Sequence, residues 1–407
     1  MNLVNKNVLV YGGGVSGVSA YKFLVKQGAN AFIFSDKKIV CEEGVKVIEK
    51  ISDVLKLKID YVILSPGVNI IGNKNIKKLK NLGALFLSEL ELGYLFCKGK
   101  FIAVTGTNGK TTCVNLINHV LSKKYKTFLC GNVGTPITSI CDQTTNDSII
   151  VCEVSSFMLE TISPNFCPDV SVILNITPDH ISRHKTLDAY FKCKLNITNF
   201  QTDKNVLFVP KELEYINTEA NKVVVLTEKF KTSLLGNFNQ LNISFCFKVC
   251  EYFGISKKFF SKAIKTFTPV SFRLEVLGKR KGVFYINDSK ATNPDSTIKA
   301  LESMHKKVVL LLGGSDKGNS FREIFKSDKI KLALIYGQTA NALESDAISM
   351  GFSNVCKFDS LKDTLSNLKK FTKRGDVVLF SPACASYDEF SSYVERGEYF
   401  NNFVENV

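Results

Sequence analysis

A short segment rich in glycine and threonine carries the residues with the clearest chemical use. Residues 105–112 read T-G-T-N-G-K-T-T, after an apolar strand pattern at 101–105 and before a helical apolar pattern at 114–121. Glycines let such a loop curl so that its N–H groups surround phosphate oxygens, while Lys110 can reach a transferred phosphoryl group and the Thr111 hydroxyl can bind Mg²⁺. The segment therefore predicts a phosphate-binding loop made of Gly106, Thr107, Asn108, Gly109, Lys110, Thr111 and Thr112.

The loop departs from the common form G-x-x-x-x-G-K-[ST], because Val104 stands in place of the first glycine. The alternative interpretation is an ordinary strand–turn–helix connection whose glycines only fit the turn. The strand before the loop and the helix after it favour nucleotide binding.

Two further apolar strands end in residues that could bind a metal ion. Strand 149–152 leads to Glu153, and a later strand leads to the run Asn175–His180. Glu153 alone could be a solvated carboxylate at a strand end, and His180 alone could be a packed or surface histidine. Beside a phosphate-binding loop, both would lie at the carboxyl edge of one sheet, where oxygen and imidazole ligands suit Mg²⁺.

Composition and charge exclude several classes of protein. The 407 residues are 45% hydrophobic and 22% charged, and no apolar run approaches the length of a membrane helix. We therefore expect a soluble, cytoplasmic protein without a secretory signal. The 12 cysteines show no C-x-x-C pair, so neither disulfides nor zinc are expected. The net charge of +15 comes from basic residues spread along the chain, so we expect no nucleic-acid partner. The lack of a long apolar run predicts no membrane insertion.

The pattern of strands and helices predicts a three-domain α/β fold. A strand at 7–11, the G-x-G-x-x-G run at 12–17 and a second strand ending at Asp36 form a Rossmann-type βαβ unit, which alone would also suit a dinucleotide. A new α/β unit begins near Phe101, and a third follows a predicted hinge at Pro269. The expected domains are 1–95, 96–269 and 270–407.

The combined motifs resemble the Mur ligases, which form amide bonds with ATP during peptidoglycan precursor synthesis. The resemblance covers residues 7–403 in order, including 105–112, Gly131-Asn132-Val133-Gly134, Glu153-Val154-Ser155-Ser156, Asn175…His180, Tyr190…Lys194, Asn239…Asn242, Arg273 and Asn287-Asp288-Ser289-Lys290. Ser65-Pro66-Gly67, the run 286–293 and the run 381–388 with Arg396-Gly397 resemble the branch that adds D-glutamate.

The resemblance implies a Rossmann-like UDP-binding domain, a central P-loop ATPase domain and a C-terminal Rossmann-like domain that binds the amino acid. It implies ATP, Mg²⁺ in two sites and a CO₂-derived carbamate on Lys194, with UDP-N-acetylmuramoyl-L-alanine and D-glutamate as substrates of a monomer. Its catalytic residues would be Lys110, Glu153, His180 and Lys194, and its metal ligands Thr111, Glu153, His180 and carbamylated Lys194. Beyond the loop, ATP would contact Asn239, Asn242, Arg273, Asp288 and Lys290. The UDP-substrate would contact Val15, Ser16, Asp36, Lys38, Gly67, Asn132 and Ser155, and D-glutamate would contact Thr292, Lys317, Ser386, Tyr387 and Tyr393.

Three positions depart from many members of the family. Phe272 stands where histidine is common, Lys38 where some carry arginine, and Tyr393 where phenylalanine is found. Competing interpretations are a related ligase for another amino acid or for folate, a nucleotide-binding regulator without catalysis, and a Rossmann oxidoreductase. The third-domain runs argue against another ligase, and the presence of Lys110, Glu153, His180 and Lys194 argues against a regulator. An oxidoreductase would explain only the first hundred residues.

Overall fold

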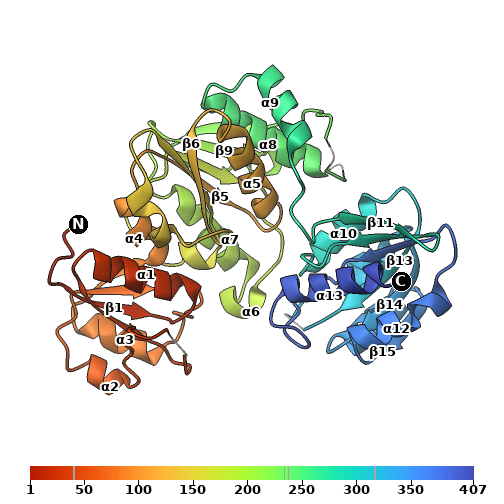
Figure 1. Cartoon of the computed structure of the whole chain (residues 1–407), viewed down its shortest axis with the longest axis horizontal. Coiled ribbons are helices and arrows are strands. Elements are labelled where there is room, and N and C mark those ends of the chain that lie inside the picture. Colours follow the sequence, from red (N-terminus) through yellow and green to blue (C-terminus); the bar gives the residue numbers. More distant parts are fainter. Residues whose placement is uncertain (40–41, 233, 237, 316–317) are drawn as a thin grey trace. The chain divides into compact units, whose positions relative to one another are not determined.

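The computed structural model describes residues 1–39, 42–232, 234–236, 238–315 and 318–407 (Figure 1). The chain forms two compact units. One comprises Met1–Ile176, Asp188–Leu226 and Ser244–Ala263, and the other comprises Thr177–Leu187, Thr227–Ile243 and Ile264–Val407. The first unit contains two α/β sheets and the second contains one. Among the described residues, no helix is long and apolar enough to cross a membrane.

The N-terminal sheet has the order β2-β1-β3-β4, and all its strands are parallel. Its strands are β1 (Asn7–Tyr11), β2 (Asn30–Phe34), β3 (Tyr61–Leu64) and β4 (Leu85–Ser88), and its helices are α1 (Val15–Lys26), α2 (Ile51–Val54), α3 (Lys74–Asn81) and α4 (Glu89–Phe96). Alternate β1 residues face opposite layers, since Val8 and Val10 join the core beneath α1 whereas Leu9 and Tyr11 join the core of α2 and α3.

The central sheet has the order β10-β9-β8-β5-β7-β6, again parallel throughout. Its strands are β5 (Lys100–Thr105), β6 (Lys126–Gly131), β7 (Ser148–Glu153), β8 (Val170–Ile173), β9 (Val206–Pro210) and β10 (Asn221–Val225). The helices in this stretch of chain are α5 (Lys110–Leu121), α6 (Ile181–His184), α7 (Leu187–Leu195), α8 (Phe238–Tyr252) and α9 (Lys257–Ala263). Because β5 pairs with both β7 and β8, the loop after β5 lies between the ends of these two strands.

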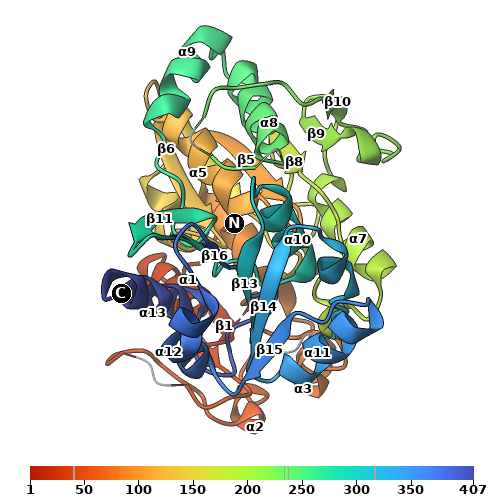
Figure 2. The ribbon, with the colours of Figure 1, turned by 90° about the vertical axis from the view of Figure 1, so that its right-hand side faces the viewer.

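The C-terminal sheet has the order β11-β12-β16-β13-β14-β15, with only the β11–β12 pair antiparallel among its described strand pairs. Its strands are β11 (Glu275–Arg280), β12 (Val283–Asn287), β13 (Val308–Gly313), β14 (Ile330–Tyr336), β15 (Val355–Phe358) and β16 (Val377–Phe380), and its helices are α10 (Pro294–Glu302), α11 (Ala340–Ser349), α12 (Leu361–Phe371) and α13 (Tyr393–Glu405). Figure 2 shows α11 and α12 on either side of β13, β14 and β15, and two separate apolar cores fill the faces of this sheet.

The glycine-rich turn after β1 depends on close contact between backbone atoms. Gly12 has a φ of +111°, which favours glycine, and its carbonyl accepts a hydrogen bond from the Ser65 hydroxyl at 3.1 Å. A Cβ at Gly17 would lie 1.8 Å from the Gly12 oxygen, so α1 can approach β1 only with glycine there. At Gly14, by contrast, a Cβ would meet no atom within 4 Å.

This difference predicts the effect of two matched substitutions. Gly17→Ala should lower the free energy of unfolding by about 1–3 kcal/mol, the usual cost of overpacking, because the added carbon clashes with backbone. Gly14→Ala should cost clearly less. Urea denaturation of both variants checks this, and equal losses would show that the contact at Gly17 does not determine stability.

Candidate active site

The phosphate-binding loop is held in shape by Asn175, which follows β8. Gly106 and Gly109 adopt positive φ values of +152° and +87°, and Gly109 is the N-cap of α5. The Asn175 side chain accepts a hydrogen bond from the Asn108 N–H and donates one to the Asn108 carbonyl, both at 2.9 Å. The Thr107 N–H donates to the backbone oxygen of Asn175 at 3.0 Å. The loop thus has the curled form that the sequence predicts, and a neighbouring strand braces it.

Lys110 lies over this loop. Its Nζ donates to the carbonyl oxygens of Gly106 at 2.7 Å and Thr107 at 2.8 Å. The ammonium is therefore within reach of any phosphate that the loop holds. Backbone amides at the start of α5, together with its helix dipole, add to the attraction for anions.

The Thr111 hydroxyl and the Glu153 carboxylate are in direct contact at the end of β7. Thr111 donates to Glu153 Oε2 at 2.8 Å, and the Asn132 amide donates to Oε1 at 2.9 Å. Glu153 is only 2% exposed. Hydroxyl and carboxylate oxygens form a donor set that suits Mg²⁺. Within the described parts of the chain, there is no group of three or more His, Cys, Asp and Glu side chains that could hold a metal ion.

Lys194 is almost fully buried beside the same loop. It is 1% exposed, and its Nζ donates to the Gly106 carbonyl at 2.8 Å and lies 4.7 Å from the centre of the Tyr190 ring. The Tyr190 hydroxyl in turn lies 3.1 Å from the Thr107 hydroxyl. Sequence position alone would make Lys194 an ordinary helix lysine, yet α7 directs it inward to the loop.

His180 belongs to the second compact unit. There, a hydrogen bond from the N-cap of α10 anchors Asp179, the residue before His180. Asp179 Oδ1 accepts the His180 N–H at 2.8 Å, and Asp179 Oδ2 accepts a hydrogen bond from Asn293, the N-cap of α10, at 3.0 Å. His180 has a φ of +54°, an uncommon value for a residue with a side chain. The structure therefore brings Thr111, Glu153 and Asn132 together, while the pairing of His180 with them stays a prediction.

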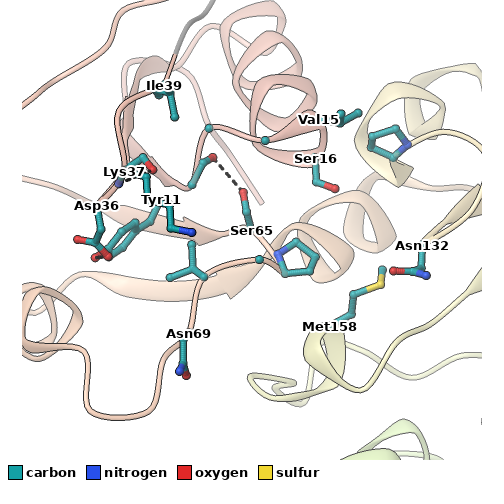
Figure 3. A pocket seen from close by; sticks show the side chains of 18 of the residues that line it. Tyr11, Val15, Ser16, Asp36, Lys37, Ile39, Ser65, Asn69, Asn132 and Met158 are labelled. Atoms are coloured by element: carbon teal, nitrogen blue, oxygen red, sulfur yellow. Dashed lines mark hydrogen bonds between the residues drawn. The ribbon is translucent and has the colours of Figure 1, made fainter. Parts of the chain in front are cut away.

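A cavity of about 830 Å³ opens at the carboxyl ends of the N-terminal strands (Figure 3). All predicted UDP-substrate residues except Ser155 line it, namely Val15, Ser16, Asp36, Lys38, Gly67 and Asn132. Ser155 accepts a hydrogen bond from the N–H of Met158, which does line the cavity. Asn132 also donates to Glu153, so one residue of the cavity lining contacts the carboxylate beside the phosphate-binding loop. Tyr11 and Asn73 also line the cavity, and sequence reasoning missed both.

The residues predicted to bind ATP and D-glutamate outside the loop fall into two groups. Asn239 and Asn242 lie near the start of α8, where Asn242 donates to Asn239 Oδ1 at 3.1 Å. Arg273 lies between Phe272 and Leu274, whose φ values of +63° and +46° mark a strained backbone. Phe272 is buried against Gly397, which explains how an apolar side chain can replace histidine there.

The remaining predicted residues lie around the ends of β12 and β16. Lys290 Nζ lies 3.5 Å from the centre of the Tyr393 ring, a cation–π contact. Ser386 is buried, Thr292 is half-buried, and Tyr387 is 75% exposed. Lys317 lies outside the described residues, so its predicted contact with D-glutamate stays a prediction.

Arg396 organises this region, although sequence reasoning left it out of the site. It is 1% exposed and donates to the backbone oxygens of Ser289, Cys384 and Ala385 at 2.8 to 3.1 Å. It thereby joins the strand ends that precede Lys290 and Ser386. The Arg396-Gly397 motif was the available signal, but only the tertiary contacts reveal what the side chain does.

Fold and site together define a three-domain α/β enzyme with a P-loop in its central sheet. Residues 104–229 match the family model of the Mur ligase middle domain, and residues 272–384 match that of the Mur ligase, glutamate ligase domain. The chain is 34% identical to the UDP-N-acetylmuramoylalanine–D-glutamate ligase of Lachnoclostridium phytofermentans, over 99% of both chains. It is 35% identical to the ligase of the same name from Lachnospira eligens, over 100% of both chains.

Solved structures agree with the fold. The MurF ligase from Thermotoga maritima in complex with ADP superposes with a TM-score of 0.63 at 18% identity, covering 99% of this chain and 96% of that one. The UDP-N-acetylmuramate-alanine ligase from the same organism gives 0.62 at 15% identity, covering 98% and 99%. The chain belongs to the Mur ligase family, in its branch of UDP-N-acetylmuramoylalanine–D-glutamate ligases. The predicted family, fold class and class of ATP-dependent ligase are thereby confirmed.

The buried carboxyl group of Asp288 should make the stability of the folded protein depend on pH. Asp288 is buried, and burial raises its pKa to about 7 despite hydrogen bonds from the Ser381 hydroxyl and the Leu274 N–H. The folded state therefore binds a proton that the unfolded state has lost between about pH 4 and 7, so stability falls as pH rises through this window.

Asp288→Asn should flatten that part of the profile, because an amide does not titrate. Unfolding free energies measured from pH 5 to pH 8 check this. Burial raises the pKa of Glu89 to about 7 as well, so Glu89→Gln measures the part of the pH dependence that comes from Glu89. A wild-type slope that persists fully in Asp288→Asn would contradict the assignment to Asp288.

Proposed function

We propose that this chain joins D-glutamate to UDP-N-acetylmuramoyl-L-alanine with conversion of ATP to ADP and phosphate, in the cytoplasmic stage of peptidoglycan precursor synthesis. One observation carries the proposal. Glu153 contacts the P-loop through Thr111 and the UDP-substrate cavity through Asn132. A substrate bound in that cavity can therefore present its far end to the phosphoryl group that the loop holds.

The chemistry begins with a carboxylate, which is a poor electrophile. Transfer of the γ-phosphoryl group of ATP to the L-alanyl carboxylate gives an acyl phosphate, and the amine of D-glutamate then displaces phosphate to form the amide. Lys110 and the loop amides stabilise charge on the transferring phosphoryl oxygens. Arg273, Asp288 and Lys290 would contact ATP from the C-terminal domain, with Asn239 and Asn242 near the adenine. Exclusion of water by these groups protects the acyl phosphate from hydrolysis.

We propose that Mg²⁺, in two sites, is held by Thr111, Glu153, His180 and a carbamate on Lys194. Bound Mg²⁺ neutralises phosphate charge. The oxygen donors of Thr111 and Glu153 fit this ion, but a cationic Lys194 would repel it. Carbamylation by CO₂ replaces that cation with an anionic oxygen donor, and the buried position of Lys194 leaves it little water to solvate its charge.

D-glutamate would bind in the C-terminal domain. Its two carboxylates need donors, which Thr292, Lys317 and Ser386 can supply, with Tyr387 and Tyr393 beside them. The contact of Lys290 with the Tyr393 ring places a cation at the same strand ends. We propose that the chain acts as a monomer.

A substrate comparison tests the function. With ATP, Mg²⁺ and UDP-N-acetylmuramoyl-L-alanine, phosphate release should require D-glutamate and should be far slower with L-glutamate or meso-diaminopimelate. Mass spectrometry of the product should show one added glutamate. Faster turnover with another amino acid would replace this substrate assignment with another one in the family.

The carbamate makes a separate prediction. Lys194→Ala should be nearly inactive and partly rescued by acetate or formate, because a small carboxylate can supply the missing oxygen donor. The matched control is Lys192→Ala in the same helix, since Lys192 is exposed and pairs with Asp188. Full activity of Lys194→Ala without added carboxylate would refute the role, as would wild-type enzyme whose mass shows a plain amine during turnover.

A further inference from the structure

The carboxylate of Asp36 is held by three side-chain donors at the edge of the UDP-substrate cavity. Its Oδ2 accepts the Tyr11 hydroxyl at 2.6 Å and the Asn73 amide at 3.1 Å. Its Oδ1 accepts the Asn75 amide at 2.9 Å. Figure 3 shows Tyr11 and Asp36 side by side at one end of the cavity. An exposed aspartate would otherwise sample several rotamers, so these contacts give it one direction.

Two features fix the donors themselves. Tyr11 ends β1, is fully buried, and packs edge-on against Phe34 with ring centres 5.1 Å apart. Asn73 is the N-cap of α3, and its Oδ1 accepts the backbone N–H groups of Asn75 and Ile76. Since Oδ1 must accept these bonds, the amide nitrogen of Asn73 must face Asp36 and Tyr11, which settles the orientation of the amide.

The hydrogen bonds also determine what Asp36 can still bind. An ionised carboxylate has about four acceptor positions, and three are occupied, so roughly one remains, on Oδ1. Burial raises the pKa of Asp36, but the hydrogen bonds from Tyr11, Asn75 and Asn73 outweigh it and leave the pKa below its ordinary value. Burial and the contact with Asp36 raise the pKa of Tyr11 to about 12, so its phenol remains a donor. Asp36 therefore offers one acceptor position and no donor.

We propose that Tyr11 is a positioning residue that, through Asp36, makes the cavity select a nucleoside diphosphate whose base carries a ring N–H, as uracil does. Uracil has this hydrogen on N3, whereas the N3 of cytosine is an acceptor that would face a carboxylate oxygen without a proton between them. Leaving two acceptors opposed costs affinity for the wrong base. The proposal rests on the proposed function, since it assumes that the cavity binds the UDP portion of the substrate.

A second donor could use the same acceptor position. In dinucleotide-binding folds, an acidic residue at the end of the second strand accepts a hydrogen bond from a ribose hydroxyl. Two analogues separate these donors, because 2′-deoxy-UDP lacks the ribose 2′-hydroxyl and CDP lacks the ring N–H of the base. The other charged groups around Asp36 are Lys37 and Lys38 of its own loop, which line the cavity, and Lys74 beside Asn73.

Calorimetric titration of the full-length protein with UDP, CDP and 2′-deoxy-UDP tests the proposal. Wild type should bind UDP and 2′-deoxy-UDP similarly and CDP much more weakly. Tyr11→Phe keeps the buried ring but loses the donor, so UDP affinity should fall roughly tenfold while CDP affinity changes little. The loss of UDP binding on acidification should also move to higher pH, because Asp36 loses a hydrogen bond to its charged form.

Two further variants separate positioning from stability. Tyr61→Phe removes a half-buried phenol from β3, for which no hydrogen bond is observed, and it should leave UDP affinity and its pH profile unchanged. Asn73→Ser keeps a good helix cap but loses the amide donor. It should therefore lower UDP affinity and move the loss of UDP binding to higher pH, as Tyr11→Phe does.

The possible failures are distinguishable. Unchanged UDP affinity and pH profile in Tyr11→Phe would overturn the role of Tyr11, even if wild type binds UDP. A large loss with 2′-deoxy-UDP in wild type would assign Asp36 to the ribose instead. If wild type binds none of the three nucleotides, the proposed use of the cavity fails, and the inference fails with it.

Discussion

The hydrogen bonds that meet at Glu153 are the constraint on which the first compact unit depends. One carboxylate oxygen accepts the Thr111 hydroxyl from the phosphate-binding loop, and the other accepts the Asn132 amide from the end of β6. A carboxylate buried to this degree is stable only when its oxygens are occupied. The parallel order β8-β5-β7-β6 satisfies this need, since it places the loop, Glu153 and Asn132 at adjacent strand ends. The loop and the cavity are thereby parts of one connected site.

The C-terminal domain uses a buried cation for a related purpose. Arg396 donates to backbone oxygens on both sides of the site, at Ser289 and at Cys384 and Ala385. A planar guanidinium can join several carbonyls at fixed angles, which lysine cannot do. Nearby, Phe272 and Leu274, on either side of Arg273, have a left-handed backbone. Strain of this kind persists only where surrounding packing enforces it, and here Phe272 is buried against Gly397.

Apolar patterns in the sequence were sufficient to predict most buried strands. The strands at 7–11, 101–105 and 149–152 were each predicted within about one residue, because buried parallel strands read as continuous apolar runs. The edge strands β10, β11 and β15 were missed, since exposure on one side lets polar residues such as Asn221 and Lys357 enter them. β4, β6 and β9 were also missed, and β6 begins with Lys126 and includes Gly131, which break an apolar run.

The residue types and order along the chain by themselves determined the family, the succession of three α/β domains and the composition of the phosphate-binding loop. Those properties are local, because a loop of fixed spacing after a strand forms the same cradle wherever it occurs. Only the tertiary structure decided that Asn175 braces the loop, that Tyr11 and Asn73 hold Asp36, and that α10 holds Asp179. These contacts join residues far apart in sequence, and the hydrogen bonds that a buried polar group needs are known only when the fold brings its partners to it.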